Sequence, residues 1–309
     1  MRAAVLAVLL AALAGCGGSS GSAHSDRLDL VLDFFPNADH AGIYAAPFAK
    51  HGLDVRIHAP SDPSAPLKLL AAGKADLAVS YEPEVLRARD KGLPVVAVAA
   101  LVRVPLTSIV SLPRAGIRRP ADLRGKTVGT AGIDYQSAYL KAIAPAGVKQ
   151  RNVGFDLVPA LVSGKVDAVL GAYWNYEAVQ LQQKGRNPRV IRIEQAGVPT
   201  YDELVIAANE RDVSDHPDRI RKFLAALKEG TAELASNPGD ALLKANPDLD
   251  PRLQRASVHA TLPYFEPARG HPYGYMDPAA WRAFTTFMHS NGLLKLSAPG
   301  GAFTNALLP

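Results

Sequence analysis

The sequence predicts an α/β protein built from two successive units, each with a mostly parallel sheet. Apolar runs of strand length alternate with helical stretches, which is the pattern of parallel sheets covered by helices. Residues 95–102 are apolar throughout, as is typical of a strand buried on both faces. The alternation begins again near residue 108, and 309 residues with 48% apolar content suffice for two cores.

In the first unit, strands and helices are expected in strict alternation. The expected strands are residues 28–33, 53–57, 75–80 and 95–102. The expected helices are residues 41–50, 67–72 and 83–91. Pro47 must lie near an end of the first helix or kink it, because proline lacks the N–H that a helix interior uses. Gly73 is expected to end the second helix.

The second unit repeats this order, and the rest of the chain is mainly helical. Its expected strands are residues 108–112, 155–158, 166–170, 190–193 and 204–208. Residues 121–129 are expected to form a turn that leads into a further strand, and a helix is expected from 132 to about 144. From Asp218 onward the apolar residues Ile220, Phe223, Leu224 and Leu227 follow helical spacing. Trp281, Phe284, Phe287 and Met288 repeat that spacing in a later helix. Both stripes are interpreted as core packing rather than as a cofactor site.

The N-terminus has the pattern of an export signal. Arg2 precedes an apolar stretch at 3–14 that is too short to span a bilayer as a helix. Leu13-Ala14-Gly15-Cys16 then resembles a bacterial lipobox, in which Cys16 is lipidated and becomes the mature N-terminus. The Gly/Ser-rich residues that follow predict a flexible tether. The alternative is a buried N-terminal helix with an incidental cysteine.

Residues 171–177, Gly-Ala-Tyr-Trp-Asn-Tyr-Glu, are the strongest candidate for a ligand site. They follow the apolar run 166–170, and polar or aromatic groups at the end of a buried strand are well placed to meet a ligand. A flat heterocycle needs an aromatic face and fixed hydrogen-bonding groups at its edge. The candidates for the face are Tyr173, Tyr176 and Trp174, and those for the edge are Asn175 and Glu177. The alternative is that these are ordinary core and rim residues.

Several classes of function are disfavoured by what the sequence lacks. Its net charge of +5 comes from 34 basic and 29 acidic residues, and the basic ones are scattered, unlike a nucleic-acid footprint. Nucleophile elbows, zinc-protease motifs, phosphate-binding glycine loops and paired cysteines are absent from the sequence. The eight histidines are dispersed, so we predict no metal, no cofactor and no catalytic residue.

Four segments together resemble the ABC-transporter substrate-binding proteins for thiamine pyrimidine precursors, the ThiY-like family. They are Leu32-Asp33-Phe34-Phe35-Pro36-Asn37-Ala38-Asp39-His40-Ala41-Gly42, Ser80-Tyr81-Glu82-Pro83-Glu84-Val85-Leu86, residues 121–129 and residues 171–177. The first and last are specific to this group, whereas residues 121–129 occur in many binding proteins of the fold. The related fungal pyrimidine synthase shares the opening segment but adds a cysteine-rich motif that this sequence lacks.

The resemblance implies a type II periplasmic-binding-protein fold, with two α/β lobes and a ligand cleft between them. We expect a signal peptide and lipobox at 1–16 and a tether at 17–27. Lobe 1 would comprise residues 28–107 and 208–309, and lobe 2 residues 108–207. The two crossovers would lie near 106–109 and 207–209, and closure around ligand would be a hinge motion.

The resemblance also implies a set of ligand-binding residues. Phe34 and Tyr173 would sandwich an aromatic ring, and Glu177 would accept a hydrogen bond from an exocyclic amino group or, if protonated, donate one to a ring nitrogen. Glu177 lies four residues after Tyr173, which on a helix would put both on one side. Further edge or wall candidates are Asp33, Ser80, Tyr81, Glu82, Tyr135 and Asn175. Asn37 and His40 are candidates either for ligand contact or for shaping their own loop.

The resemblance implies a lipid-anchored, monomeric receptor on the extracytoplasmic face, which passes an aminopyrimidine to an ABC permease and its ATPase. Two departures bear on the ligand: Phe34 stands where the family usually has tryptophan, and the helix after His40 is about one turn shorter than usual. One alternative is a receptor for another cargo, such as a flavin precursor, a sulfonate or another heterocycle. The other is an enzyme of thiamine-pyrimidine synthesis.

Overall fold

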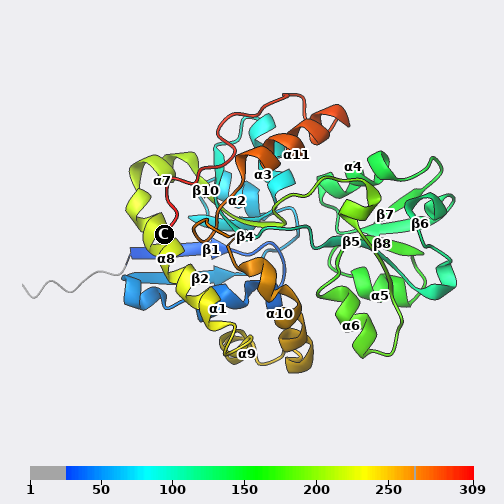
Figure 1. Ribbon diagram of the computed structural model, residues 1–309, viewed down its shortest axis with the longest axis horizontal. Helices are drawn as coiled ribbons and strands as arrows, with labels where there is room; N and C mark the ends of the chain where they lie inside the picture. Colours follow the sequence, from blue (N-terminus) through cyan, green and yellow to red (C-terminus); the bar gives the residue numbers. More distant parts are fainter. Residues whose placement is uncertain (1–25, 268) are drawn as a thin grey trace, which may run out of the picture.

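The chain forms two α/β lobes that lie side by side in this computed structural model, which describes residues 26–267 and 269–309 (Figure 1). Cys16 and the predicted signal peptide lie outside the described residues. Asp26 and Arg27, predicted as the end of a tether, already belong to the first strand, because they pair with Leu53 and Asp54. In the described part of the chain, none of the helices has the length and apolarity needed to cross a lipid bilayer.

Lobe 1 contains a sheet with the strand order β2-β1-β3-β10-β4. Its strands are β1 (Asp26–Val31), β2 (Leu53–His58), β3 (Leu77–Ser80), β4 (Val95–Val102) and β10 (Leu204–Asn209). Its helices are α1 (Ala41–Ala45), α2 (Pro66–Ala71), α3 (Glu82–Asp90), α7 (Glu210–Asp215), α8 (Pro217–Glu233), α9 (Asp240–Ala245), α10 (Pro251–Phe265) and α11 (Pro278–Ser290). β1 is parallel to β2 and β3, whereas β10 is antiparallel to β3 and β4.

Lobe 2 repeats this arrangement with the strand order β7-β6-β8-β5-β9. Its strands are β5 (Thr107–Ser111), β6 (Thr127–Thr130), β7 (Lys149–Asn152), β8 (Ala168–Tyr173) and β9 (Arg189–Arg192). Its helices are α4 (Asp134–Ile143), α5 (Leu157–Val162) and α6 (Glu177–Gln183). β6 is parallel to β7 and β8, and β5 is antiparallel to β8 and β9. The two-unit α/β architecture is therefore confirmed, but each sheet has one antiparallel strand, supplied by the chain as it crosses between lobes.

Two sequence predictions on the strands of lobe 2 are wrong. Residues 155–158 are not a strand, since α5 begins at Leu157, and the missed strand is β7. All four residues of β7 (Lys-Gln-Arg-Asn) are exposed, so this edge strand has no apolar pattern to reveal it. The return to lobe 1 also comes earlier than residues 207–209, because β10 lies wholly in the first sheet from Leu204 onward.

The segment after the first strand is shaped by Pro47, as expected. Ala46 adopts an extended conformation, which is the preference of a residue before proline, and α1 ends at Ala45. A turn of 3-10 helix at Phe48–His51 follows, closed by Gly52 at φ +75°. Later in the chain, the apolar stripe of α8 is buried, which confirms its assignment as core. α8 packs against α1 on the outer side of lobe 1.

The two crossovers between the lobes are tied together by one buried carboxylate, that of Glu203. Its Oε2 accepts hydrogen bonds from the backbone N–H groups of Leu106 (2.7 Å) and Thr107 (2.7 Å) and from the hydroxyl of Tyr201 (3.0 Å). Its Oε1 accepts from the hydroxyl of Thr107 at 2.8 Å. Because Glu203 stands at the end of the second crossover and Leu106 in the first, this side chain joins both crossover segments.

Candidate functional site

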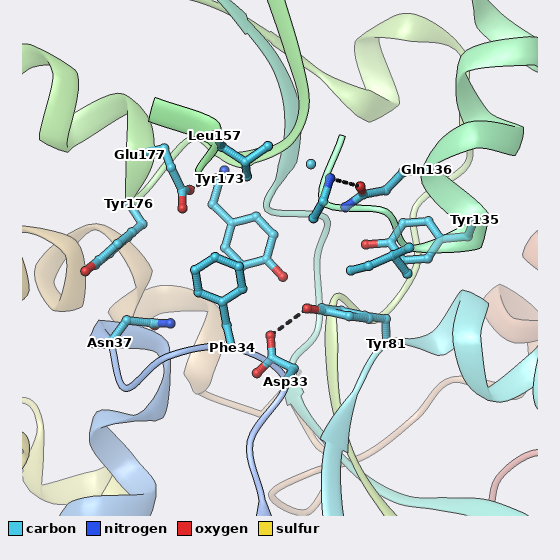
Figure 2. A pocket seen from close by; sticks show the side chains of 13 residues that line it. Asp33, Phe34, Asn37, Tyr81, Tyr135, Gln136, Leu157, Tyr173, Tyr176 and Glu177 are labelled. Atoms are coloured by element: carbon cyan, nitrogen blue, oxygen red, sulfur yellow. Dashed lines mark hydrogen bonds between the residues drawn. The ribbon is translucent and has the colours of Figure 1, made fainter. Parts of the chain in front are cut away.

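A cleft lies between the two lobes, with about 410 Å³ of empty space when its open mouth is included (Figure 2). Eight of the residues predicted as site candidates line it: Asp33, Phe34, Asn37, Tyr81, Tyr135, Tyr173, Tyr176 and Glu177. The remaining lining residues are Ala131, Ile133, Gln136, Leu157 and Gly171. Most follow the carboxyl ends of β1, β3, β6 and β8, which is where ligands meet sheets of this kind.

Asp33 is the polar centre of the lobe 1 wall. It is 2% exposed, and its Oδ2 accepts a hydrogen bond from the Tyr81 hydroxyl at 2.7 Å (Figure 2). Its Oδ1 lies 2.8 Å from Nε2 of His40. The other ring nitrogen of His40 accepts from the backbone N–H of Asn37, which leaves the ring proton on Nε2 to be donated to Asp33. His40 is therefore buried behind the cleft and orients Asp33 instead of lining the cavity.

Asn37 shapes its own loop, which is the second of the two roles predicted for it. Its Oδ1 accepts from the backbone N–H of Asp39 at 2.9 Å, and its Nδ2 donates to the carbonyl of Phe35 at 3.0 Å. These bonds begin the short 3-10 helix Ala38–His40. Asn37 thus shapes the loop that carries Asp33 and Phe34, while its side chain also lines the cleft.

Aromatic rings from both lobes meet at the mouth of the cleft. Phe34 of lobe 1 packs edge-on against Phe155 of lobe 2, with ring centroids 4.5 Å apart and planes at 81°. Phe35, which is 50% exposed, lies 4.3 Å from the same ring. Tyr173, at the end of β8, lines the cleft from lobe 2. Phe34 and Tyr173 are thus presented from opposite lobes, as a ring-stacking site requires.

Glu177 begins α6 and presents a buried carboxyl group to the cleft. Its Oε2 accepts from the backbone N–H of Tyr173 at 2.7 Å. The prediction that one helical turn places Tyr173 and Glu177 on the same side is wrong, because Tyr173 is the last residue of β8 and Glu177 the first of α6. The hydrogen bond between them closes the turn that joins this strand to this helix. Burial raises the pKa of Glu177 to about 7, so this group exchanges its proton near neutral pH.

Gln136 lies across the cleft from Glu177 (Figure 2), and Gly171 is also among the lining residues. The Gln136 Oε1 accepts from the backbone N–H of Ala131 at 2.9 Å. Gly171 has φ +102°, which side-chain-bearing residues rarely adopt. A Cβ atom at residue 171 would lie 2.3 Å from Nε2 of Gln136, so a larger residue would displace that amide.

Asn175 lies outside the cavity and bridges the lobes beside it. Its Nδ2 donates to Oδ1 of Asp39 at 2.7 Å and to the hydroxyl of Thr261, on α10, at 2.6 Å. Burial raises the pKa of Asp39 to about 6. Because Asp39 and Thr261 belong to lobe 1, the structure assigns Asn175 to interlobe contact and not to the ligand edge predicted for it.

Ser80 and Glu82 also lie outside the cavity. The Ser80 hydroxyl donates to Glu84 at 3.2 Å. Glu82 accepts from the backbone N–H of Asp202 at 2.7 Å, and Asp202 in turn accepts from the indole N–H of Trp281 at 2.7 Å. Burial, reinforced by the Asp202 carboxylate, raises the pKa of Glu82 well above its usual range. Ser80 and Glu82 are the sequence neighbours of Tyr81 on either side, and their side chains bond Glu84 and Asp202 instead of facing the cavity.

The charge of the lining residues restricts what the cleft can bind. Asp33 and Glu177 are its ionisable carboxyl groups, and among the described residues that line it there is no lysine, arginine or histidine. An organic anion needs such a cation or a comparable donor clamp. In residues 26–267 and 269–309 no three histidine, cysteine or acidic side chains gather closely enough to hold a metal ion. The cleft therefore suits a neutral or amino-bearing aromatic molecule.

The sequence matches a family model described as NMT1/THI5 like over residues 37–241. It is 34% identical to a protein of Halalkalibacterium halodurans named formylaminopyrimidine-binding protein, over 94% of each chain. It is 27% identical to a 4-amino-5-hydroxymethyl-2-methylpyrimidine phosphate synthase of Saccharomyces cerevisiae, over 74% of this chain and 73% of the yeast one.

The fold also matches solved binding proteins. The alkanesulfonate-binding protein SsuA of Xanthomonas axonopodis pv. citri superimposes with a TM-score of 0.68, covering 90% of this chain and 98% of that one. At 16% identity, this match speaks for the fold alone. The two-lobed fold of the periplasmic binding proteins, predicted from the sequence, is confirmed.

Proposed function

This chain belongs to the NMT1/THI5-like family, and on that premise we propose that it is a receptor that binds an aminopyrimidine precursor of thiamine between its lobes. The observation that carries the proposal is the cleft itself. It offers aromatic rings from both lobes, Phe34 and Tyr173, together with two buried carboxyl groups, Asp33 and Glu177, and its described lining has no cation. A flat, uncharged ring with an amino group at its edge can stack on the aromatic rings and donate hydrogen bonds to the carboxyl groups.

In this proposal the ring stacks between Phe34 and Tyr173, and its amino edge faces Glu177. The Oε2 atom already accepts from Tyr173, so Oε1 is the atom available for a second contact with the ligand. A protonated carboxyl group at this place donates to a ring nitrogen while it accepts from the neighbouring amino group. Asp33 is held by His40 and Tyr81 and supplies a second fixed acceptor in the wall. Tyr81 and Asn37 complete that wall.

We include in the proposal delivery to an ABC permease and its ATPase, which the likeness to periplasmic binding proteins supports. The lipobox at Leu13–Cys16 supports anchoring through a lipidated Cys16 on the extracytoplasmic face. The receptor would act there as a monomer, with residues 28–107 and 208–309 moving against 108–207. β10 lies in the first sheet from Leu204 onward. In this proposal, the boundary between the two moving lobes therefore lies between the end of β9 and Leu204.

A binding role is favoured over an enzymatic one by the comparisons. The relative named as a binding protein is more similar and more fully covered than the synthase, at 34% against 27% identity. The synthase alternative also gives no reason for the N-terminal export pattern. A sulfonate receptor fits poorly as well, because the described cleft lining offers no positive group.

The pH dependence of binding tests the role of Glu177. Because its pKa is raised to about 7, the carboxyl group is protonated below that pH and donates to the ring nitrogen. We expect the affinity for an aminopyrimidine to be level below about pH 7 and to fall about tenfold per pH unit above it, as the proton must be taken up on binding. Calorimetric titration in buffers of different ionisation enthalpy measures this uptake.

Two substitutions at Glu177 separate its chemistry from its bulk. Glu177→Gln keeps an acceptor for Tyr173 and a donor for the ring nitrogen, so its affinity should no longer fall above pH 7. Glu177→Ala removes both contacts and should weaken binding by about 1–3 kcal/mol. Unchanged affinity in Glu177→Ala would remove this residue from the site.

A further inference from the structure

The segment 174–176, which joins β8 to α6 in lobe 2, is in contact with α10 of lobe 1. α10 lies on the side of lobe 1 that faces α6 (Figure 1). The ring of Trp174 packs edge-on against Tyr264, with centroids 5.6 Å apart and planes at 77°. The hydroxyl of Tyr176 accepts from Nε2 of Gln254 at 3.0 Å. Two residues of the segment are therefore held by side chains of this helix.

Asn175, the third residue of the segment, uses both N–H bonds of its amide on lobe 1. One donates to Oδ1 of Asp39 at 2.7 Å and the other to the hydroxyl of Thr261 at 2.6 Å. That hydroxyl donates in turn to the carbonyl of Ser257, one turn earlier on α10, at 2.8 Å. Asn175 and Thr261 are fully buried, where a donor without an acceptor is costly. These bonds therefore favour the arrangement in which the two lobes meet.

α10 is anchored in lobe 1 at both ends. At its start, Asp250 accepts hydrogen bonds from two backbone N–H groups of the first turn. At its end, Arg103 in the first crossover donates to the carbonyls of Pro263 at 3.1 Å and Glu266 at 2.9 Å. The helix therefore provides a fixed surface against which the lobe 2 segment packs.

The α10 side chains that bond this segment, Gln254 and Thr261, are not among the described residues that line the cleft. The residues on either side of the segment, Tyr173 and Glu177, do line it. An effect of α10 on a bound molecule therefore passes through residues 174–176. The bonds between α10 and this segment join protein groups to each other, so a ligand is not required for them to form.

We propose that Gln254 and Thr261 are positioning residues, which hold lobe 2 against lobe 1 and thereby keep Tyr173 and Glu177 in place for the ligand. The inference rests on the proposed function for its ligand and concerns how that site is kept closed. Release of a bound molecule requires the lobes to part, which breaks the bonds between α10 and residues 174–176. These bonds therefore slow dissociation without contact to the ligand.

The test measures the dissociation rate of 4-amino-5-hydroxymethyl-2-methylpyrimidine by stopped-flow fluorescence. Thr261→Val keeps the size of the side chain but removes the acceptor for Asn175, so dissociation should be about tenfold faster. Gln254→Leu removes the donor to Tyr176 and should raise the rate by a smaller factor. In an Asn175→Ala background, Thr261→Val should add little, because the bond that it removes is already absent.

Thr285→Val is the matched control. The Thr285 hydroxyl donates to the carbonyl of Trp281, one turn earlier on α11, at 2.7 Å, so this variant loses the same kind of helix bond within lobe 1. Hydrogen exchange of residues 174–177, measured without ligand, adds a readout that does not depend on the cargo. Exchange there should be faster in Thr261→Val than in the native protein and unchanged in Thr285→Val.

The outcomes separate the two proposals. Native dissociation and exchange rates in both α10 variants would overturn the role of α10, while the pyrimidine receptor stands. Equal effects in Thr285→Val would also overturn it, because helix stability would then be the cause. Faster exchange in Thr261→Val, in a protein that binds no aminopyrimidine, would overturn the proposed function and retain the role of α10.

Discussion

Replacement of Asp33 by alanine is expected to lower the free energy of unfolding by about 3–5 kcal/mol and to remove ligand binding. The Asp33 carboxylate accepts from Nε2 of His40 at 2.8 Å and from the Tyr81 hydroxyl at 2.7 Å, and all three side chains are buried. Alanine would leave both donors without an acceptor inside lobe 1. Urea unfolding of the purified protein at pH 7, paired with titration of an aminopyrimidine, measures both effects.

Two milder variants serve as controls for Asp33. Asp33→Asn keeps the size of the side chain and one acceptor oxygen, so its loss of stability should be smaller, about 1–3 kcal/mol. Tyr81→Phe removes one donor and leaves the bond to His40 intact. If Asp33→Ala unfolded no more easily than Asp33→Asn, the carboxylate would not be the centre of this network.

Replacement of Glu203 by alanine should be similarly damaging, although Glu203 lies outside the ligand cleft. Its carboxylate accepts from two backbone N–H groups and two hydroxyl groups, all within 3.0 Å. Without the carboxylate, these donors are buried and unpaired. Each unpaired donor costs about 1–3 kcal/mol of stability, and water or rearrangement offsets part of that cost. We expect the free energy of unfolding to fall by about 3–5 kcal/mol, as measured by urea unfolding.

The same change should also weaken ligand binding, because the crossover segments contact the proposed site. Thr107 pairs with Tyr173 across β5 and β8, and the backbone N–H of Trp174 donates to the carbonyl of Leu106 at 3.1 Å. Loosening Leu106 and Thr107 should therefore loosen Tyr173, whose ring is proposed to stack on the ligand. Glu203→Gln, which keeps an acceptor for both backbone N–H groups, should retain most of both properties. Equal losses in the two variants would show that geometry at Glu203 matters less than its charge.

The sequence was sufficient for features that local patterns encode. Apolar runs located most strands, and the i, i+3, i+4 stripe located α8, because burial of one face imposes those spacings. The strand β7 was missed because its four exposed polar residues carry no such pattern. The antiparallel course of β5 and β10 was missed because strand direction is set by the crossovers rather than by the strand's own residues.

Within the site, residues at strand ends were predictable and their partners were not. Tyr173 was proposed because it comes shortly after the apolar run 166–170, and Asp33 and Tyr81 were proposed through the family resemblance; all three line the cleft. Asn175 was placed at the ligand edge, yet it bonds Asp39, which lies 136 residues earlier in the chain. Pairings of this kind depend on how the lobes meet, which no local pattern shows.

Gln136 was missed for a different reason. A glutamine at the start of a helix is usually a solvent-exposed residue, and its importance depends on the space left by Gly171 on a neighbouring strand. Gly171, directly after the predicted strand 166–170 and at the start of the aromatic stretch, was the available indication, since a glycine in a strand often marks close approach by another group.

The most direct test of the whole account is calorimetric titration of the purified protein with aminopyrimidine thiamine precursors, with thiamine and riboflavin as comparisons. The account predicts saturable one-to-one binding of an aminopyrimidine, with much weaker binding of the two larger molecules. If no aminopyrimidine bound, the two-lobed fold would stand, but the ligand and the roles of Phe34, Tyr173 and Glu177 would be contradicted.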